Sequence, residues 1–292
     1  MSDEINYLNL LKDVLESGEI RENRTGINTI SKFGTHVSFD LKKGFPLLTT
    51  KRVFFRGVVE ELLFFLSGES DTTILKDKNV KIWEGNTSRE FLDKKNLTHF
   101  KEGEYGESYG YNWRHFGKEY TPIKHRDEHY LPEGGTDQIK IVLDLLKTDK
   151  YSRRILFTAW NPSVLEKIPL PPCHIMAQFY VNKDDELSCH VYMRSVDLFL
   201  GLPFNIASYA LITHIFAYFS GLKVGILNFS FGDSHIYTNH IEQVKIQLSR
   251  DCIDFPTIQI KEGIKDIDSF TFDSFVLENY NSHDTIKAEM AV

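Results

Sequence analysis

Cys173 is the residue best suited to covalent chemistry, and it lies in the run Leu170-Pro171-Pro172-Cys173-His174. The two prolines restrict the preceding backbone, so the thiol is presented rigidly. Thiolates are nucleophiles, but a free cysteine is also among the most commonly buried residues. The other cysteines, Cys189 in an alternating strand-like run and Cys252 in an acidic stretch after a helix, lack this setting. Cys173 is therefore the first candidate nucleophile, with a buried apolar side chain as the alternative.

Several arginines stand beside small hydroxylated residues. Arg153 and Arg154 follow a serine at the start of a predicted strand, whereas Arg24 precedes a threonine and Arg194 a serine. A guanidinium group pairs with two phosphate oxygens at once, so converging arginines would bind a phosphate monoester. The alternative is that each arginine only caps an element or forms a surface salt bridge. The net charge of −7 permits such a local cluster but argues against broad nucleic-acid binding.

A long motif from Met193 to Tyr209 contains polar residues around a glycine-proline turn. Asp197 and Asn205 flank this turn, which leads into an apolar helix. The Asn205 amide offers a donor and an acceptor, which match O4 and N3–H of a uracil edge. N-capping of the helix is the structural alternative.

A second polar run, Gly232-Asp233-Ser234-His235-Ile236-Tyr237, offers His235 and Tyr237 as hydrogen-bond partners for a sugar hydroxyl. We expect no metal site, because the chain has neither a His-Glu-x-x-His motif nor paired cysteines at zinc-ligand spacing. The aromatic run from Tyr105 to Trp113 is typical of packing as well as of a site wall.

The elements that must position these residues follow from hydrophobic periodicity. Apolar spacing predicts helices at about residues 4–16, 57–66, 137–146, 204–219 and 234–248. It also predicts a strand or hairpin at about 27–40 and strands at about 155–160, 175–181, 187–192 and 227–231. Residues 84–136 are charged and glycine-bearing, which indicates loops. Strands and helices without regular alternation favour an α+β fold over a doubly wound sheet. No linker or repeat divides the chain, so residues 1–292 are predicted to form a single domain.

Composition also limits the compartment. Three cysteines without regular spacing do not make a disulfide framework and indicate a reducing environment. The acidic start Met1-Ser2-Asp3-Glu4 lacks the regions of a signal peptide. The apolar stretch Phe204–Phe219 carries polar residues and is shorter than the ~20 residues needed to span a bilayer. We expect a buried core helix there, and a cytoplasmic or nuclear protein without membrane attachment.

The motifs together resemble the thymidylate synthase family in their order and spacing. The matching runs are Arg24-Thr25-Gly26, Phe45-Pro46-Leu47-Leu48-Thr49-Thr50-Lys51, Tyr109-Gly110, Ser152-Arg153-Arg154, Pro172-Cys173-His174, Arg194-Ser195-Val196-Asp197, Gly201-Leu202-Pro203-Phe204-Asn205 and the run from Gly232 to Tyr237. The similarity extends from about residue 5 to Met290-Ala291-Val292. It implies a thymidylate synthase-like fold, in which a mixed β-sheet and flanking helices surround a long buried central helix.

The resemblance implies reductive methylation of dUMP to dTMP. In this family 5,10-methylenetetrahydrofolate is both one-carbon donor and reductant, and dihydrofolate is released. Cys173 would add to C6 of the uracil ring and make C5 a nucleophile, which splits one difficult step into two easier ones. Nearby Arg154 and Arg194 would supply positive charge that favours the thiolate.

The resemblance also assigns residues to roles. Glu61 would organise water and proton transfers, and Tyr109 would help remove the C5 proton. The implied catalytic residues are Cys173, Glu61, Tyr109, Asn205, Asp197 and Arg194. The implied nucleotide contacts are Arg24, Arg194, Ser195, Asp197, Asn205, His235 and Tyr237, with Arg153 and Arg154 supplied by the partner subunit of a homodimer. The implied folate contacts are Lys51, Ile82, Trp83, Asn86, Asp197, Leu200, Gly201, Phe204 and Ala291, the last within a tail that closes over the complex.

Three positions depart from the family pattern. Met193 stands where glutamine is usual, Phe64 where tryptophan is frequent, and Glu107 where proline is common. None removes a proposed reacting group, so we expect altered binding constants and dynamics with activity retained.

Three other functions are alternatives. A deoxycytidylate hydroxymethylase would add water in place of hydride, but an aspartate at position 205 would suit cytosine better than Asn205 does. A thiol hydrolase would need an oxyanion hole and a group that orients the histidine, for which no local signature exists. A noncatalytic nucleic-acid binder would need basic patches. We therefore expect dUMP and folate as partners, with no obligatory nucleic acid.

Overall fold

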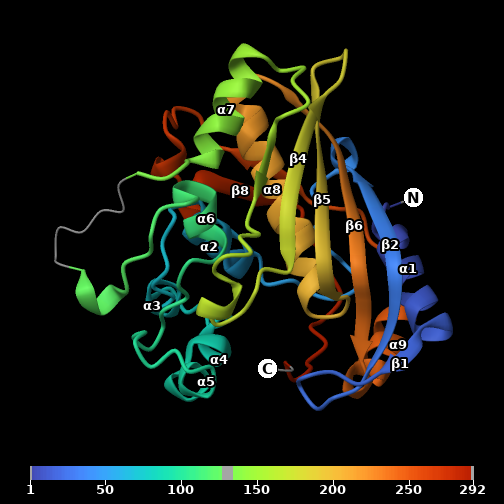
Figure 1. The fold of residues 1–292 in the computed structure, drawn as a ribbon. Helices are drawn as coiled ribbons and strands as arrows, with labels where there is room; N and C mark the ends of the chain where they lie inside the picture. Colours follow the sequence, from blue (N-terminus) through green and yellow to red (C-terminus); the bar gives the residue numbers. More distant parts are fainter. Residues whose placement is uncertain (1, 127–133, 291–292) are drawn as a thin grey trace.

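The computed structural model describes residues 2–126 and 134–290, and its centre is a six-stranded sheet in the order β1-β2-β6-β5-β4-β3 (Figure 1). All neighbouring strands in this sheet are antiparallel except β5 and β6, which are parallel. A separate antiparallel pair joins β7 to β8. The strands are β1 (Glu19–Arg21), β2 (Thr29–Asp40), β3 (Leu156–Thr158), β4 (His174–Val181), β5 (Glu186–Asp197), β6 (Lys223–Tyr237), β7 (Thr257–Ile260) and β8 (Phe275–Glu278). The sheet is therefore mixed, as predicted.

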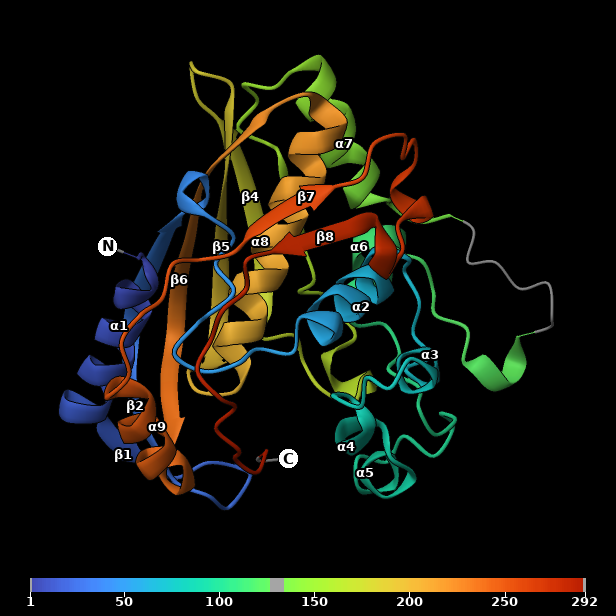
Figure 2. The same ribbon diagram turned by 180° about the vertical axis from the view of Figure 1, so that it is seen from behind.

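The chain forms nine α-helices within its described residues. They are α1 (Glu4–Ser17), α2 (Phe55–Leu66), α3 (Thr73–Asp77), α4 (Glu84–Thr87), α5 (Arg89–Lys94), α6 (Tyr109–His115), α7 (Gln138–Thr148), α8 (Gly201–Ser220) and α9 (Ile241–Leu248). Helices α1 and α8 pack on one face of the central strands, whereas α3, α4 and α5 lie to one side of the sheet (Figure 2). Among the described residues, only α8 is long and apolar enough to cross a membrane, by length and composition alone. Most of α8 is buried between the sheet and the β7-β8 pair, which explains its apolar surface on all sides. The predicted core helix is confirmed.

The crossover from β5 through α8 to β6 positions the polar motifs. Parallel strands need a long connection of this kind, and it brings their carboxyl ends to the same edge of the sheet. In the register, Ser195 faces Asp233 and Asp197 faces His235. Two motifs that lie about forty residues apart in the sequence are therefore neighbours, and both adjoin the first turn of α8.

The two faces of the sheet have different surroundings. Along β6, Leu227, Phe229 and Phe231 point into the core, whereas the alternate residues Asn228 and Ser230 are only partly buried. This alternation follows from the two-residue period of a strand. Figure 1 shows the second face, over which no helix of the described chain lies across β4, β5 and β6.

Two parts of the predicted element map were wrong. The helix expected from residue 234 begins only at Ile241, because Ser234 to Tyr237 complete β6, with Ser234 and Ile236 buried between its neighbour strands. The region 84–136 contains helices α4, α5 and α6 within what was expected to be loops. The other predicted elements are confirmed, although β5 and β6 extend beyond their predicted ends. The structure also contains β1, α3, β7 and β8, which were not predicted.

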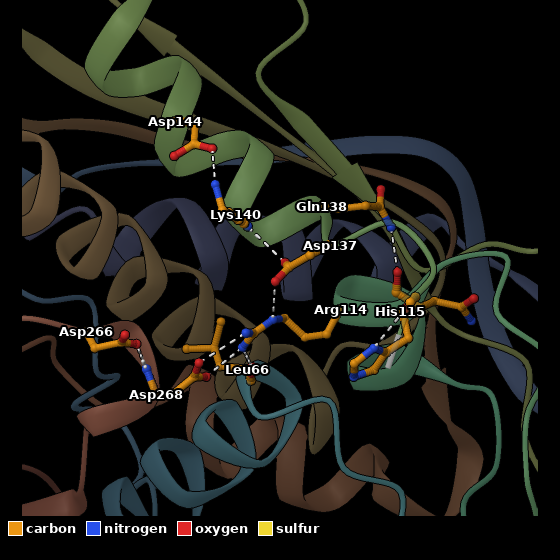
Figure 3. A network of polar contacts seen from close by, with 11 residues as sticks. Leu66, Arg114, His115, Asp137, Gln138, Lys140, Asp144, Asp266 and Asp268 are labelled. Atoms are coloured by element: carbon orange, nitrogen blue, oxygen red, sulfur yellow. Dashed lines mark hydrogen bonds and ion pairs between the residues drawn. The ribbon is translucent and has the colours of Figure 1, made fainter. Parts of the chain in front are cut away.

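Arg114 clamps several of these elements together near the end of α6 (Figure 3). Its Nε donates to Oδ2 of Asp137, which caps α7, at 3.0 Å. Its two terminal nitrogens donate to the two carboxylate oxygens of Asp268 at 2.6 and 3.1 Å. One of them also donates to the carbonyl of Leu66 at the end of α2. The clamp thus fixes α2 against α6, the two helices that carry the candidates Glu61 and Tyr109.

Candidate active site

Cys173 lies directly before β4, where the strand is irregular. The pairing of β4 with β5 shifts register between His174 and Met176, a kind of bulge that is frequent beside active sites. The backbone of Cys173 is held on both sides: its N–H donates to the Tyr109 hydroxyl oxygen at 2.6 Å, and its carbonyl accepts from the Arg194 N–H at 2.9 Å. The half-buried thiol therefore has a fixed position between β5 and α6.

The Arg194 side chain covers this thiol. Its Nε donates to the carbonyl of Pro172 at 2.7 Å, and Nη2 donates to that of Pro171 at 2.9 Å. The same Nη2 lies 3.9 Å from Sγ of Cys173. The two prolines thus do more than stiffen the loop, because their carbonyls hold a guanidinium group beside the sulfur.

The expectation that the charge of Arg194 favours the thiolate is confirmed in direction, but burial outweighs that charge. Burial raises the pKa of the Cys173 thiol, and the charges of Arg194 and Arg24 and a bond with Tyr109 only partly offset that rise. Removing a thiolate from water disfavours it more than these neighbours favour it. The contributing arginines are Arg194 and Arg24, and the same chain's Arg154 is not among them.

His174 is not the partner of the thiol despite its adjacency in sequence. Its ring stacks on Tyr109 with centroids 3.9 Å apart, and its Nδ1 is 2.7 Å from the Tyr209 hydroxyl. Burial lowers the pKa of His174 to about 3, so the imidazole is neutral at physiological pH. It packs as an aromatic residue, which excludes the Cys-His pair of a thiol hydrolase.

Asn205 and Asp197 lie together at the start of α8. Asn205 is the fifth residue of the helix, so the capping alternative was wrong: the cap position is Leu200. The Asn205 amide has no hydrogen-bond partner in the described part of the chain, and the side chain is only partly buried. A Cβ built at Gly201 would lie 3.6 Å from Cβ of Asp197 and 4.0 Å from Oδ1 of Asn205. Asp197 itself accepts from the N–H groups of Phe199 and Leu200, which fixes the entry to the helix.

The end of β6 supplies the next polar groups. His235 Nδ1 is 2.9 Å from Oδ1 of Asp233, and its ring meets that of Tyr237 edge-on at 5.2 Å. Burial raises the pKa of the Tyr237 hydroxyl, as does the charge of Asp197, while Arg24 lowers it. Because Arg24 acts on both Tyr237 and Cys173, it lies near both although its side chain is exposed. The fold therefore brings Arg24, Arg194, Ser195, Asp197, Asn205, His235 and Tyr237 to one edge of the sheet.

Glu61 lies on α2 behind an aromatic wall. Its Oε1 accepts from the Trp83 indole nitrogen at 2.9 Å, and burial raises the pKa of its carboxyl from 4.5 to about 7. Trp83 packs on Tyr105 with ring centroids 4.4 Å apart and lies 6.3 Å from Tyr109. A carboxyl with this pKa can both hold and release a proton near neutral pH.

Lys51 is a buried amine on the other side of the α8 entry. Its Nζ donates to the Phe199 carbonyl and lies 3.6 Å from the centroid of that ring. Burial lowers the pKa of Lys51 to about 7, and the charge of Asp197 raises it in part. Because Phe199 lies in the segment that leads into α8, its contact with Lys51 places the amine near Asp197, Leu200 and Gly201.

The other expected folate contacts in the described chain lie on α4, on α8 and in the residues that directly precede these two helices. Asn86 on α4 is buried and its N–H donates to the carbonyl of Trp83, which Ile82 precedes. Phe204 on α8 approaches α2, because a Cβ at Gly57 would lie 3.3 Å from its ring. Ala291 lies outside the described residues.

Arg153 and Arg154 do not lie with the other candidate site residues of the same chain. Both are exposed and lie just before β3, the edge strand of the sheet. The Arg153 carbonyl accepts from the Gln178 side chain on β4 at 3.1 Å.

The three residues that depart from the family pattern, Met193, Phe64 and Glu107, are buried or partly buried in this chain. Met193 is buried between His174 and Phe231 in the sheet. Phe64 faces a cavity of about 480 Å³ on the outer side of α2. Glu107 is partly buried, which raises its pKa, while Lys167 lowers it. That these positions alter binding constants and dynamics with activity retained stays a prediction.

One positioning residue escaped the sequence analysis. Glu4 is completely buried and its two carboxylate oxygens accept four hydrogen bonds, from the backbone N–H and hydroxyl groups of Thr49 and Thr50. These threonines directly precede Lys51, so the first turn of α1 fixes the segment that carries the buried amine. No local pattern marks an acidic residue at the start of a helix for this purpose.

This geometry is typical of an enzyme that uses a cysteine nucleophile on an anionic substrate, and comparison with known proteins gives the family. The family model for thymidylate synthase matches residues 5–292. Human thymidylate synthase is 47% identical over 289 residues, which cover 99% of this chain and 91% of the human protein. The enzyme of human herpesvirus 8 is 47% identical over 99% of this chain and 85% of its own length. The chain belongs to the thymidylate synthase family.

Some relatives are longer. The bifunctional dihydrofolate reductase-thymidylate synthase of maize is 49% identical over 290 residues, and that of Leishmania major is 49% identical over 292. Each match covers 99% of this chain but 55% of the relative. The chain spans about half the length of these bifunctional relatives.

Proposed function

We propose that the protein catalyses the reductive methylation of dUMP to dTMP, with 5,10-methylenetetrahydrofolate as one-carbon donor and reductant. Family membership supports this reaction. The observation that carries it is the Arg194 guanidinium, which lies beside the Cys173 thiol while its own strand leads to Asp197 and the entry of α8. One edge of the sheet thus offers a nucleophile, cations for a phosphate and an amide for a base.

The first step is addition of Cys173 to the pyrimidine. The thiol loses its proton, sulfur bonds to C6, and the electron pair of the C5–C6 double bond moves toward O4. Asn205, whose amide has no partner in the described chain, would donate to O4 and accept from N3–H. Hydrogen bonds aimed at the developing enolate lower the barrier because they are already oriented.

Carbon–carbon bond formation and reduction follow. C5 attacks the methylene group of the folate, and the C5 proton then leaves. The bond between the methylene carbon and the folate nitrogen then breaks, which leaves an exocyclic methylene on C5 while sulfur stays bonded to C6. Hydride transfer from the folate converts this group to methyl as the C6–S bond breaks and the C5–C6 double bond returns. The products are dTMP and dihydrofolate, with the thiol restored.

Glu61 and Tyr109 have distinct roles in these proton transfers. Glu61 has a pKa of about 7 through burial, so it exchanges protons at neutral pH. Burial raises the pKa of Tyr109 well above its ordinary value, and its oxygen already accepts from the Cys173 N–H. Tyr109 therefore stays protonated, and it would assist removal of the C5 proton through a bound water.

The remaining contacts divide between nucleotide and folate. We assign the phosphate to Arg24, Arg194 and Ser195, and the sugar hydroxyl to His235 and Tyr237. The folate would lie against Lys51, Ile82, Trp83, Asn86, Asp197, Leu200, Gly201 and Phe204, with Ala291 closing over it. Lys51 gains a proton readily at neutral pH, which suits an anionic co-substrate.

We infer that two copies form a homodimer in which Arg153 and Arg154 act in the partner's site. Both arginines are exposed beside a sheet face that no helix of the described chain covers. A second copy would bury that face and bring its arginines to the phosphate. Mixing inactive Cys173→Ala subunits with inactive Arg153→Ala subunits should then restore activity, whereas a mixture that stays inactive contradicts the shared site.

The proposed reaction is tested by dihydrofolate formation. Purified protein with methylenetetrahydrofolate should raise the absorbance at ~340 nm only when dUMP is added, because reduction is coupled to methylation. Turnover of dCMP but not dUMP would contradict the uracil assignment made for Asn205. Free thiols at all three cysteines suit a reducing compartment, and we propose a cytoplasmic or nuclear location.

A further inference from the structure

His240 connects the C-terminal segment to the site. It ends the 3-10 turn Thr238–His240 that follows β6, and its side chain is completely buried. Its Nε2 lies 2.7 Å from the carbonyl oxygen of Glu289. A carbonyl oxygen only accepts hydrogen bonds, so Nε2 carries the proton and donates it. The imidazole thus holds the backbone of residues 281–290 from inside the protein.

The same ring touches one residue from each half of the site. Its centroid is 5.7 Å from that of Tyr237, which in turn meets His235 edge-on. It is also 5.6 Å from the centroid of Phe199, whose carbonyl and ring hold the amine of Lys51. A displacement of His240 would therefore shift the proposed sugar contacts, Tyr237 and His235, and the proposed folate contact, Lys51.

Packing alone would not require an imidazole here. Nδ1 of His240 is buried without a hydrogen-bond partner among the described residues. An unpaired buried nitrogen is unfavourable, and an apolar ring of similar shape would avoid that cost. The bond from Nε2 to the C-terminal segment is the one polar interaction in the described structure that explains this residue type.

The earlier part of the segment is attached independently. The Arg250 side chain donates to the carbonyls of Thr50 and Asp284 at 2.8 and 2.7 Å, and the N–H of His283 donates to the Thr49 carbonyl at 2.8 Å. These bonds fix residues near 283. Ile286 and Ala288 pack on the hydrophobic core, and His240 supplies the polar anchor at Glu289.

We propose that His240 is a positioning residue that couples nucleotide binding to the placement of the C-terminal segment. A nucleotide sugar held by Tyr237 and His235 restrains the imidazole, and the imidazole restrains the Glu289 carbonyl. The segment is then held for folate before folate arrives. This role rests on the proposed function, because it takes dUMP and folate as the ligands of the two halves.

The test compares three variants by hydrogen exchange of the 281–290 peptide, with and without dUMP. His240→Phe keeps a ring but removes the donor, whereas His240→Gln keeps a donor near the position of Nε2. His283→Phe is the matched control, because His283 also bonds a backbone carbonyl through Nε2, at 3.0 Å from the oxygen of Asp251, but away from Tyr237 and Phe199. Melting temperature, the Kd of dUMP and the KM of folate are measured on the same proteins.

In His240→Phe we expect exchange of the segment to rise about fivefold in the free protein, since one hydrogen bond is lost. The slowing of exchange that dUMP causes in the parent protein should disappear, and the KM of folate should rise about tenfold while the Kd of dUMP changes less than about twofold. His240→Gln and His283→Phe should keep the coupling, and the melting temperature of His240→Phe should not fall.

Unchanged exchange in His240→Phe would overturn the proposal, and so would a glutamine variant as uncoupled as the phenylalanine variant, since ring packing would then suffice. Exchange of the free protein requires no substrate. A parent protein that binds no dUMP would contradict the proposed function while leaving the comparison of the free variants readable.

Discussion

The two sides of the candidate site differ in how much water reaches them. On the β5-α8-β6 side, Arg194, Asp197 and Asn205 are partly exposed. On the α2-α6 side, Glu61 and Tyr109 are buried, and burial displaces the pKa of each. We call the β5-α8-β6 side the wetter wall of the site and the α2-α6 side the drier wall. The wetter wall can exchange hydration for contacts with a charged ligand, whereas burial in the drier wall changes the proton affinity of Glu61 and Tyr109. Ligand recognition and proton transfer therefore use different walls of the site, which meet at Cys173.

Replacing the residue where the walls meet should have the largest effect. Cys173→Ser should lower kcat by on the order of 10³-fold or more, because a hydroxyl is a far weaker nucleophile than a thiol. The Kd of dUMP, measured by calorimetry, should change little because the wetter side is intact. A serine variant with full turnover would contradict covalent catalysis.

On the drier side, Glu61→Gln should lower kcat by about 10²- to 10³-fold through loss of acid–base function. The Kd of dUMP should stay within a few-fold of the parent value. Steady-state kinetics and equilibrium binding on one preparation separate the two effects. A variant that lost dUMP affinity in parallel with kcat would contradict the assignment of ligand recognition and proton transfer to different walls of the site.

The same variant has a pH signature in stability. The Glu61 pKa is raised from 4.5 to about 7, so its contribution to stability is fully present below pH 4.5 and is lost as pH rises through 7. Glutamine does not ionise. The free energy of unfolding of Glu61→Gln, from urea titrations, should therefore rise relative to the parent protein between about pH 5 and pH 8. A pH-independent difference would contradict the raised pKa.

Removing the Arg114 clamp, which holds the drier wall together, should have an intermediate effect on kcat. Arg114→Met breaks the clamp between α2 and α6 and leaves the partly buried Asp137 carboxylate without its ion-pair partner, which should cost about 2 kcal/mol of stability in urea unfolding. We expect kcat to fall more than dUMP affinity, because Glu61 and Tyr109 lie on the clamped helices. The exposed pair Lys140–Asp144 provides the control, since Lys140→Met should change neither quantity measurably.

The smallest effect on activity is expected at Met193. Met193→Gln restores the residue usual in the family but puts an amide into the buried centre of the sheet, at an expected cost of about 1–3 kcal/mol in stability. The Kd of dUMP should be unchanged because the side chain lies in the core. A large gain in dUMP affinity would instead show that this position reaches the wetter wall.

Local pattern predicted most of the fold. The spacing of Tyr7, Leu11 and Val14 predicted α1, and the apolar stretch predicted α8, because each element buries a periodic face. The pattern failed where tertiary pairing decides the structure, as at Ser234 to Tyr237, which β2 and β5 hold as strand. It also failed for α6, whose helix follows from packing of an aromatic run. The single-domain extent of 1–292 stays a prediction.

Motifs also predicted which residues gather at the site, but not their environment. The neighbourhood of Asp197 and His235 depends on one parallel pairing across the sheet. The support of Lys51 by Glu4 depends on residues far apart in sequence. The direction of the Cys173 pKa depends on the balance of burial against charge, which no motif encodes. The assigned roles stay predictions until variants are measured.

Burial of Cys173 has a consequence for the chemical durability of the protein. Peroxides and alkylating agents attack thiolates, and the raised pKa keeps the resting sulfur mostly as thiol at neutral pH. The side chain should therefore survive oxidants that modify exposed cysteines of ordinary pKa. Its reactivity would be directed to an electrophile that is large enough to displace water and anionic enough to meet Arg194. Desolvation thus protects the sulfur from small reagents in the protein without bound substrate.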